Sequence, residues 1–324
     1  MKVYVTRRIP QPGIDMIVKE HEVEINPYDR VLTREELLKA VKGKDGILTL
    51  LTDRIDAEVF DAAGPQLKVV SNYAVGYDNI DVNEATRRRI VVTNTPGVLT
   101  ETTADLAWTL IMSVARRIVE ADRFTRAGRY DGWAPMLFLG QDIFGKTLGI
   151  IGMGRIGQAV ARRAKGFNMK VIYNDLKRIP EELEKELNAT FVSLDELLEN
   201  SDFVSLHTFL SPETHHLINE DRLKKMKKTA YLINTSRGPV VDESALVKAL
   251  KEGWIAGAGL DVYEFEPKLT PGLVECENTV LLPHIASASV ETRTKMATMA
   301  AENLLAVLAN KRPPNPVNPE VLKI

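Results

Sequence analysis

Thr147-Leu-Gly-Ile-Ile-Gly-Met-Gly-Arg-Ile-Gly157 is the stretch of sequence that decides the fold. Its apolar first half is typical of a buried strand, and the residues that follow, up to Lys165, favour a helix. The glycines between them are spaced Gly-x-Gly-x-x-Gly. Gly152 suits a tight turn, Gly154 lets a ligand approach the backbone, and Gly157 lets the helix pack closely on the strand.

An acidic residue follows this stretch where a ribose-binding carboxylate is expected. Lys170 to Asp175 is a second strand-like run, and it ends in the acid about 20 residues after the glycines. The helix N-terminus between the two strands offers N–H groups to a pyrophosphate. Strand, glycines, helix, strand and acid together predict a domain that binds a dinucleotide.

The acid also indicates which dinucleotide is bound. Asp175 would accept hydrogen bonds from the ribose 2′- and 3′-hydroxyls of NAD and would repel the 2′-phosphate of NADP. Lys177 and Arg178 lie close in sequence and offer NADP partial compensation. We therefore expect NAD as the cofactor, with NADP as the alternative.

Length and composition exclude several classes of protein. A chain of 324 residues suggests two domains, and a net charge of −2 gives no basic surface for nucleic acid. The single cysteine, Cys276, excludes an internal disulfide and a cysteine-rich metal site. No secretory signal or membrane-spanning run is apparent. We expect a cytoplasmic protein that binds no metal, no nucleic acid and no membrane.

Strands and helices alternate twice along the chain, which predicts an α/β fold with two doubly wound parallel sheets. The strand-like runs are Val3–Thr6, Glu22–Asn26, Gly46–Leu51, Leu67–Asn72 and Ile90–Thr93, and then residues 148–152, 170–174, 202–207, 230–234, 256–261 and 279–282. We expect the second set to form six strands in the order 3-2-1-4-5-6. Pro96 and Gly97 mark the crossing between the domains. A long helix from Glu101 to Ala121 and a final helix from Val290 to Ala309 complete the pattern.

Residues 128–144 have no clear period but contain many large apolar side chains. Such a segment has to be covered. A partner subunit could cover it, or the segment could fold back on its own core, and the sequence leaves both readings open.

Polar residues follow three strands of the second set, where ligands bind in parallel sheets. Arg237 can grip a carboxylate with two hydrogen bonds. His284 can give or take the proton of an alcohol, and a carboxylate beside it favours the imidazolium form. Glu264 and Glu266 are two residues apart, so we expect only one of them to face the site. These groups suit the reduction of a 2-oxo acid by a nicotinamide hydride.

Other readings of the same residues remain open at this point. Arg237 could form an ordinary surface ion pair, and His207, at the end of the strand at 202–207, competes with His284 for the catalytic role. Spacing alone does not choose between the two histidines.

Three further stretches carry a family resemblance: Asn234-Thr-Ser-Arg-Gly238, Asp261-Val-Tyr-Glu-Phe-Glu-Pro267 and Leu282-Pro-His-Ile-Ala-Ser287. In order after the glycine stretch, they resemble the D-isomer-specific 2-hydroxyacid dehydrogenases, and most of all the glyoxylate/hydroxypyruvate reductases. The similarity runs from Val3 to about Val321. It implies a Rossmann domain for NAD at 99–287, with a dimerisation arm near 121–145. It also implies a flavodoxin-like substrate domain at 1–98 and 288–324, with a cleft between the domains.

The resemblance also assigns roles to individual residues. Arg237 binds the substrate carboxylate and carbonyl, His284 is the acid/base, and Glu266 is the partner that keeps it charged. His207 falls in a segment beside the adenosine, where Phe209 replaces the usual proline and leaves the shape of the adenine pocket open. Further substrate contacts are implied for Leu51, Val75, Gly76 and Trp133 of the partner subunit. Cofactor contacts are implied for Thr103, Gly152, Gly154, Arg155, Ile156, Gly157, Asp175, Thr208, Thr235, Ser236, Asp261 and Ser287.

The activity that the resemblance implies is NAD(H)-dependent reduction of glyoxylate or hydroxypyruvate to glycolate or D-glycerate, by a homodimer. A 3-phosphoglycerate dehydrogenase is the first alternative, although no second basic cluster for a phosphate is apparent. An NAD-sensing binding module of the corepressor type is the second. Such a module would retain the same Arg, Glu and His, so only a measurement of turnover distinguishes it from an enzyme.

Overall fold

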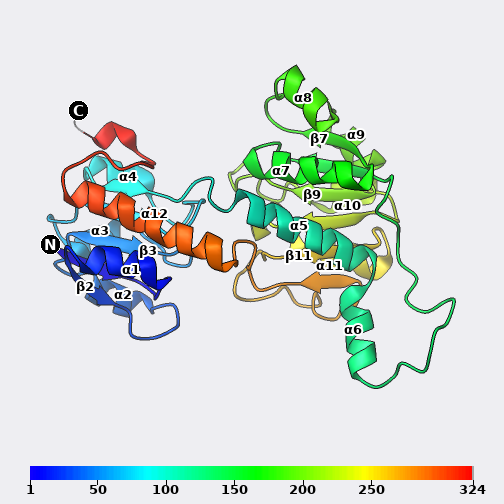
Figure 1. The fold of residues 1–324 in the computed structure, drawn as a ribbon, viewed down its shortest axis with the longest axis horizontal. Coiled ribbons are helices and arrows are strands. Elements are labelled where there is room, and N and C mark those ends of the chain that lie inside the picture. Colours follow the sequence, from blue (N-terminus) through cyan, green and yellow to red (C-terminus); the bar gives the residue numbers. More distant parts are fainter. Residues whose placement is uncertain (323–324) are drawn as a thin grey trace. The chain divides into compact units, whose positions relative to one another are not determined.

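The structure is a computed structural model that describes residues 1–322 (Figure 1). The chain divides into two compact units. Unit 1 is Met1–Leu99 together with the chain from Ser287 onward, and unit 2 is Thr100–Ala286. Among the described residues, no helix has both the length and the apolarity needed to cross a lipid bilayer.

Unit 1 contains a five-stranded sheet, parallel throughout, in the order β2-β1-β3-β4-β5. Its strands are β1 (Lys2–Val5), β2 (Glu22–Ile25), β3 (Gly46–Thr49), β4 (Val69–Asn72) and β5 (Val91–Thr93). Its helices are α1 (Gln11–Val18), α2 (Arg34–Ala40), α3 (Ala57–Ala63), α4 (Val82–Arg87) and α12 (Val290–Leu308), with a short 3-10 turn, η3 (Pro319–Val321). The order is that of a flavodoxin-like sheet, as the sequence predicts.

Alternate residues of each strand in unit 1 face opposite layers of helices. Leu48 packs with α1 and α12 on one face, and Ile47 packs with α2 and α3 on the other. α2 begins with a capping box. The Thr33 hydroxyl accepts from the Glu36 N–H, and the Glu36 carboxylate accepts from the Thr33 N–H.

Unit 2 contains a seven-stranded parallel sheet in the order β12-β11-β10-β9-β6-β7-β8. Its strands are β6 (Thr147–Ile151), β7 (Lys170–Asn174), β8 (Ala189–Phe191), β9 (Phe203–Leu206), β10 (Tyr231–Asn234), β11 (Gly257–Leu260) and β12 (Thr279–Leu281). Its helices are α5 (Thr100–Ala115), α6 (Ile118–Arg126), α7 (Arg155–Ala164), α8 (Glu181–Leu187), α9 (Leu194–Asn200), α10 (Glu220–Lys225) and α11 (Glu243–Glu252), with 3-10 turns η1 (Lys165–Phe167) and η2 (Gly238–Val240). Helices α5, α7 and α8 pack on one face and α9 to α11 on the other.

The strand count of this sheet differs from the prediction of six. The short strand β8 forms the edge, and β9 lies beside β6 in the middle of the sheet rather than at the edge. Three residues show neither an alternating pattern nor a run of apolar side chains, so the sequence gives no signal for β8.

The predicted single helix from Glu101 to Ala121 is also wrong. The chain forms α5 and α6 instead, separated by Arg117 in a left-handed conformation with a φ of 54°. In a continuous helix the Ala115 carbonyl would accept from the Val119 N–H. Here it accepts from the Gln141 N–H, at 2.9 Å. The break therefore involves a residue that is distant in sequence. No glycine or proline lies at the break to signal it in the sequence.

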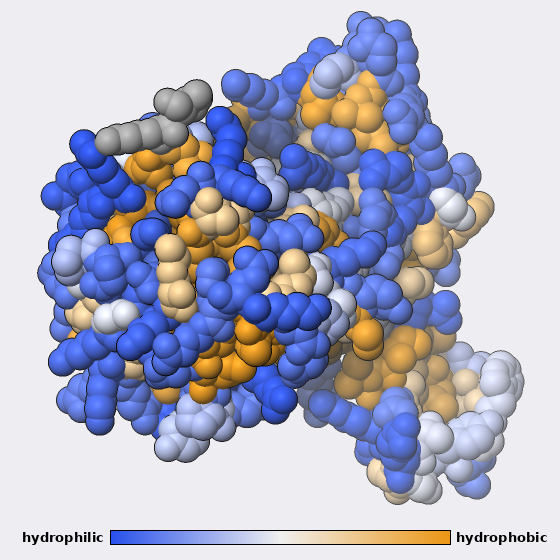
Figure 2. Space-filling view, turned by 60° about the vertical axis from the view of Figure 1, so that its left-hand side comes forward, coloured by the Kyte–Doolittle hydropathy of each residue, from blue (hydrophilic) through white to orange (hydrophobic). Residues whose placement is uncertain are grey.

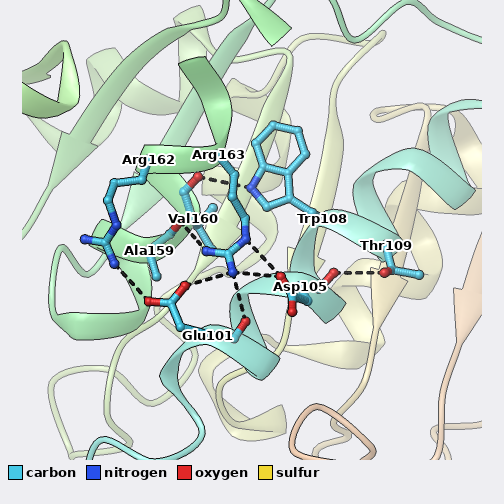
Figure 3. A network of polar contacts seen from close by, with 8 residues as sticks. All are labelled: Glu101, Asp105, Trp108, Thr109, Ala159, Val160, Arg162 and Arg163. Carbon is cyan, nitrogen blue, oxygen red and sulfur yellow. Dashed lines mark hydrogen bonds and ion pairs between the residues drawn. The ribbon is translucent and has the colours of Figure 1, made fainter. Parts of the chain in front are cut away.

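A network of charged side chains joins α5 to α7 (Figure 3). The Arg163 guanidinium donates to the Asp105 carboxylate at 2.7 Å and to the Ala159 carbonyl at 2.8 Å, and it forms an ion pair with Glu101 at 2.8 Å. Arg162 forms an ion pair with Glu101, at 3.0 Å. The network holds the first turns of α5 against the helix that follows the glycine stretch.

Replacing Arg163 with Met should lower the free energy of unfolding by about 1–2 kcal/mol, because several charge-assisted hydrogen bonds are lost at a side chain that is only 26% exposed. Arg162→Met is the matched control. This substitution removes one exposed ion pair and should lower the free energy of unfolding by at most about 0.5 kcal/mol. Urea unfolding of the two variants measures the difference, and equal losses would contradict the role given to Arg163.

The segment after α6 is irregular, as its sequence predicts, and it leaves large apolar side chains exposed. Trp133, Met136 and Leu139 are 84%, 75% and 57% exposed. In Figure 2 the part formed by α6 and this segment, at the lower right, carries hydrophobic surface. The reading in which the segment folds back on its own core is therefore wrong for these side chains.

Candidate active site

The glycine loop joins β6 to α7 with the geometry that a bound pyrophosphate needs. Gly152 has a φ of 95°, and a Cβ there would lie 2.6 Å from the His207 carbonyl oxygen. At Gly157 a Cβ would lie 2.2 Å from the Gly152 carbonyl oxygen. At Gly154, which caps α7, a Cβ would meet nothing within 4 Å, so this part of the loop is open to a ligand.

The acid predicted to bind the ribose lies beside this loop. Asp175 directly follows β7 and is half-buried, and its carboxylate accepts from the Met153 N–H at 2.6 Å. Arg155 and Ile156 form the first turn of α7, where backbone N–H groups have no partner inside the helix. These residues thus come together at one end of β6 and β7.

Two buried hydroxyl groups at the neighbouring strand ends support a ligand here. Thr208 follows β9 and Thr235 follows β10, and the Oγ1 atoms of both are buried without a hydrogen-bond partner among the described residues. Leaving a buried hydroxyl unpaired costs about 1–3 kcal/mol unless something binds it. The residues present therefore fit a dinucleotide. Thr103 is buried in the first turns of α5, while Ser236 already donates to the Asn234 side chain, at 3.0 Å.

Three adjacent strands position the predicted catalytic side chains. Arg237, Glu266 and His284 follow β10, β11 and β12, respectively, and the carboxyl ends of these parallel strands share one edge of the sheet. The His284 Nδ1 lies 3.0 Å from the Glu266 Oε2, and the other Glu266 oxygen accepts from the Tyr263 N–H at 3.0 Å.

The electrostatics of this pair keep the carboxylate ionised. Burial raises the pKa of Glu266. The hydrogen bond and charge of His284, the Tyr263 N–H and the charge of Arg237 outweigh burial, so the pKa lies below its ordinary value. An ionised carboxylate can only accept hydrogen bonds, so the contact of Glu266 with the His284 Nδ1 orients the imidazole.

The rival histidine is unsuited to give a proton. His207 is half-buried and its Nε2 lies 2.8 Å from the Ser205 hydroxyl, and burial lowers its pKa to about 3. It is therefore neutral at physiological pH. The rival carboxylate is engaged elsewhere, because Glu264 lies 2.7 Å from the His216 Nε2 and accepts from the Glu243 N–H.

The structure adds a contact that the sequence does not suggest. Asp261 is fully buried, and its two carboxylate oxygens accept from the Ile285 and Ala286 N–H groups, both at 2.7 Å. These residues directly follow His284, which has a left-handed φ of 57°. Asp261 therefore fixes a backbone conformation that is uncommon for a residue other than glycine. Asp261 was predicted as a cofactor contact, and nothing in the spacing reveals this second task.

Three of the predicted substrate residues, Leu51, Val75 and Gly76, lie in unit 1. Leu51 follows β3 and is 38% exposed, and Val75 and Gly76 follow β4. The carbonyls of Val75 and Gly76 accept from Asn94 and Asn72, at 2.7 and 2.9 Å. Within residues 1–322, neither Val75 nor Gly76 donates its own N–H, which suits an anion-binding loop. Ser287 begins the return of the chain to unit 1, and Trp133 lies in the exposed segment after α6.

Comparison with known proteins fixes the family. The model of the D-isomer specific 2-hydroxyacid dehydrogenase NAD-binding domain matches residues 108–286, more than half of the chain. The chain belongs to the D-isomer specific 2-hydroxyacid dehydrogenase family. The matched residues lie in unit 2, which therefore contains an NAD-binding domain of this family.

Relatives of this dehydrogenase match along its whole length. A protein of Thermococcus kodakarensis named glyoxylate reductase is 57% identical, and the match covers 100% of this chain and 98% of that one. A Thermus thermophilus protein of known crystal structure is 50% identical, with a TM-score of 0.91. The match covers 98% of this chain and 100% of that one. A third relative is an NADPH-dependent glyoxylate/hydroxypyruvate reductase of Sinorhizobium meliloti, whose structure was solved with NADP and malonate. It is 34% identical, with a TM-score of 0.85, and the match covers 98% of this chain and 96% of that one.

Proposed function

We propose that this dehydrogenase reduces glyoxylate or hydroxypyruvate to glycolate or D-glycerate with NADH. The observation that carries the proposal is the His284–Glu266 pair, held at 3.0 Å at the strand ends of an NAD-binding domain. Full-length relatives named glyoxylate reductases support the choice of substrate.

Each residue of the pair has a distinct task in the proposal. The bound nicotinamide supplies the hydride. His284 gives its proton to the carbonyl oxygen of the substrate, and Glu266 stabilises the charged imidazole before that transfer. Arg237 binds the substrate carboxylate through its guanidinium.

The remaining substrate contacts of the proposal come from unit 1 and from a second copy of the chain. The N–H groups of Val75 and Gly76 bind the carboxylate, and Leu51 packs on a small substrate. The exposed apolar segment at 128–144 joins two copies in a homodimer, which brings Trp133 of the partner subunit to the substrate. Light scattering checks the dimer, and a monomer at assay concentration would remove this contact.

NAD is the proposed cofactor because Asp175 lies at the end of β7, beside the glycine loop. Its charge suits two ribose hydroxyls and repels a 2′-phosphate. The S. meliloti relative uses NADPH, so the family accommodates both dinucleotides. Initial rates with NADH and NADPH at equal concentration test the choice, and a tenfold preference for NADPH would overturn it.

A panel of 2-oxo acids tests the activity itself. NADH oxidation is followed with glyoxylate, hydroxypyruvate, pyruvate and phosphohydroxypyruvate. We expect the highest kcat/KM with glyoxylate or hydroxypyruvate. A preference for phosphohydroxypyruvate would instead identify a 3-phosphoglycerate dehydrogenase, and no turnover with any of the four would identify an NAD-binding module.

Arg237→Ala should raise the KM for the oxo acid by about 10- to 100-fold, because charge-assisted hydrogen bonds to the carboxylate are lost. Arg237→Lys should give an intermediate KM, since an ammonium keeps the charge but cannot bind in the bidentate way. Steady-state kinetics measure both values, with the Kd for NADH as the control. An unchanged KM in Arg237→Ala would remove this residue from the substrate site.

A further inference from the structure

The loop that follows β7 rests on a buried carboxylate. Glu184, on α8, is only 6% exposed. The Tyr173 hydroxyl donates to its Oε1 at 2.6 Å and itself accepts from the Ile179 N–H at 3.1 Å. This arrangement ties the end of β7 and the loop at 175–180 to α8.

Glu184 also holds the arginine of that loop in a bidentate ion pair. The Arg178 Nε lies 2.8 Å from Glu184 Oε1, and its Nη2 lies 2.7 Å from Oε2. The hydrogen bond from Arg178, followed by the one from Tyr173, lowers the pKa of Glu184 to about 2. The carboxylate is therefore ionised at every pH at which the protein would work, and both oxygens stay engaged.

The position of this arginine matters for the choice of dinucleotide. Arg178 lies three residues after Asp175, on the loop where dinucleotide domains place the ribose and where an arginine can accommodate the 2′-phosphate of NADP. A guanidinium whose Nε and Nη2 are both paired with a buried carboxylate has its charge neutralised and its side chain directed to α8.

We propose that Glu184 is a cofactor-specificity residue, which excludes NADP by keeping Arg178 bound to α8. This inference rests on the proposed dinucleotide-dependent function and adds to the repulsion by Asp175. Glu184 works in two ways. It occupies the Nε–Nη2 edge of the guanidinium, which could otherwise bind a 2′-phosphate, and its charge cancels that of the arginine. It touches neither substrate nor cofactor, so it is a positioning residue.

Lys177 provides the contrast within the same loop. It is exposed, and over residues 1–322 it forms no ion pair, so Glu184 does not restrain it. Lys177→Met is therefore the matched control. It removes one positive charge from the loop and leaves the Arg178–Glu184 pair in place.

The test measures the Kd of NAD⁺ and of NADP⁺ by calorimetry, without any oxo acid. Glu184→Gln should tighten NADP⁺ binding by about tenfold, the worth of one charge-assisted hydrogen bond, and leave the NAD⁺ Kd within about twofold. Glu184→Gln/Arg178→Met should lose this gain, although its net charge equals that of the starting protein. A gain that persists in the double variant, or no gain in Glu184→Gln, would overturn the inference.

A second variant leaves Glu184 untouched, in case Glu184→Gln unfolds. Arg178→Met should leave both Kd values within about twofold, because an arginine held on α8 contributes nothing to NADP⁺ binding. Lys177→Met should weaken NADP⁺ binding alone. A tenfold loss of NADP⁺ affinity in Arg178→Met would show that the arginine already reaches the phosphate and would overturn the inference. Binding of neither dinucleotide would overturn the proposed function as well, whereas NAD⁺ binding with an unmoved NADP⁺ Kd would overturn this inference only.

Discussion

His284→Ala is expected to lower kcat for the reduction of glyoxylate or hydroxypyruvate by about 10²- to 10⁴-fold, the range for loss of a general acid. The NADH Kd should change little, because the imidazole acts on the oxo acid. The variant should also raise the pKa of Glu266, since burial then acts without the hydrogen bond and charge of His284. Steady-state kinetics and NMR titration of the carboxylate measure the two effects.

His215→Ala is the matched control for this variant. His215 is an exposed histidine of the same unit, stacked on His216 with ring centroids 4.1 Å apart, and it should keep kcat within about twofold. A near-normal kcat in His284→Ala would transfer the proton donation to another group. His207 would not be the replacement, because its lowered pKa keeps the imidazole neutral.

Gly157→Ala is expected to weaken NAD⁺ binding at least tenfold and to lower the free energy of unfolding by about 1–3 kcal/mol, the usual cost of overpacking. A Cβ at this position would lie 2.2 Å from the Gly152 carbonyl oxygen and 3.2 Å from Ile150 Cγ2. Backbone cannot yield as a flexible side chain does. The helix α7 therefore has to move away from β6, and its N-terminus moves with it.

Gly166→Ala controls for the substitution itself. Gly166 lies in the 3-10 turn just after α7, its φ is outside the left-handed region, and a Cβ there would meet nothing within 4 Å. Its NAD⁺ Kd and its urea midpoint should match those of the unsubstituted protein. If Gly157→Ala also bound NAD⁺ normally, the close approach of loop and helix would have no part in cofactor binding.

The structural features that depend on neighbouring residues could be predicted from the sequence. The glycine spacing predicts the turn at Gly152, the open position at Gly154 and the tight packing at Gly157, because each depends on the absence of a Cβ. The alternation of strands and helices predicts both sheets, since parallel strands need helical crossovers. The rule that ligands bind beyond strand ends selects Arg237 and His284 for attention.

The features that the sequence does not give either lack a local pattern or depend on how separate segments pack together. Strand β8 is too short to show a pattern in the sequence. Helix α5 ends where the Gln141 N–H donates to the Ala115 carbonyl. The sequence places Arg178 near the ribose as a possible aid to NADP, but only the structure shows it paired with Glu184. Such pairs depend on tertiary packing, which local propensity does not encode.

The two backbone hydrogen bonds that Asp261 accepts have a consequence for mutagenesis of this enzyme. Every amino acid except proline carries the same donor, so the side chain at position 285, which is 36% exposed, is free to vary while the imidazole of His284 stays in place. A library at Ile285 should therefore yield many active clones. Ile285→Pro should be missing among them.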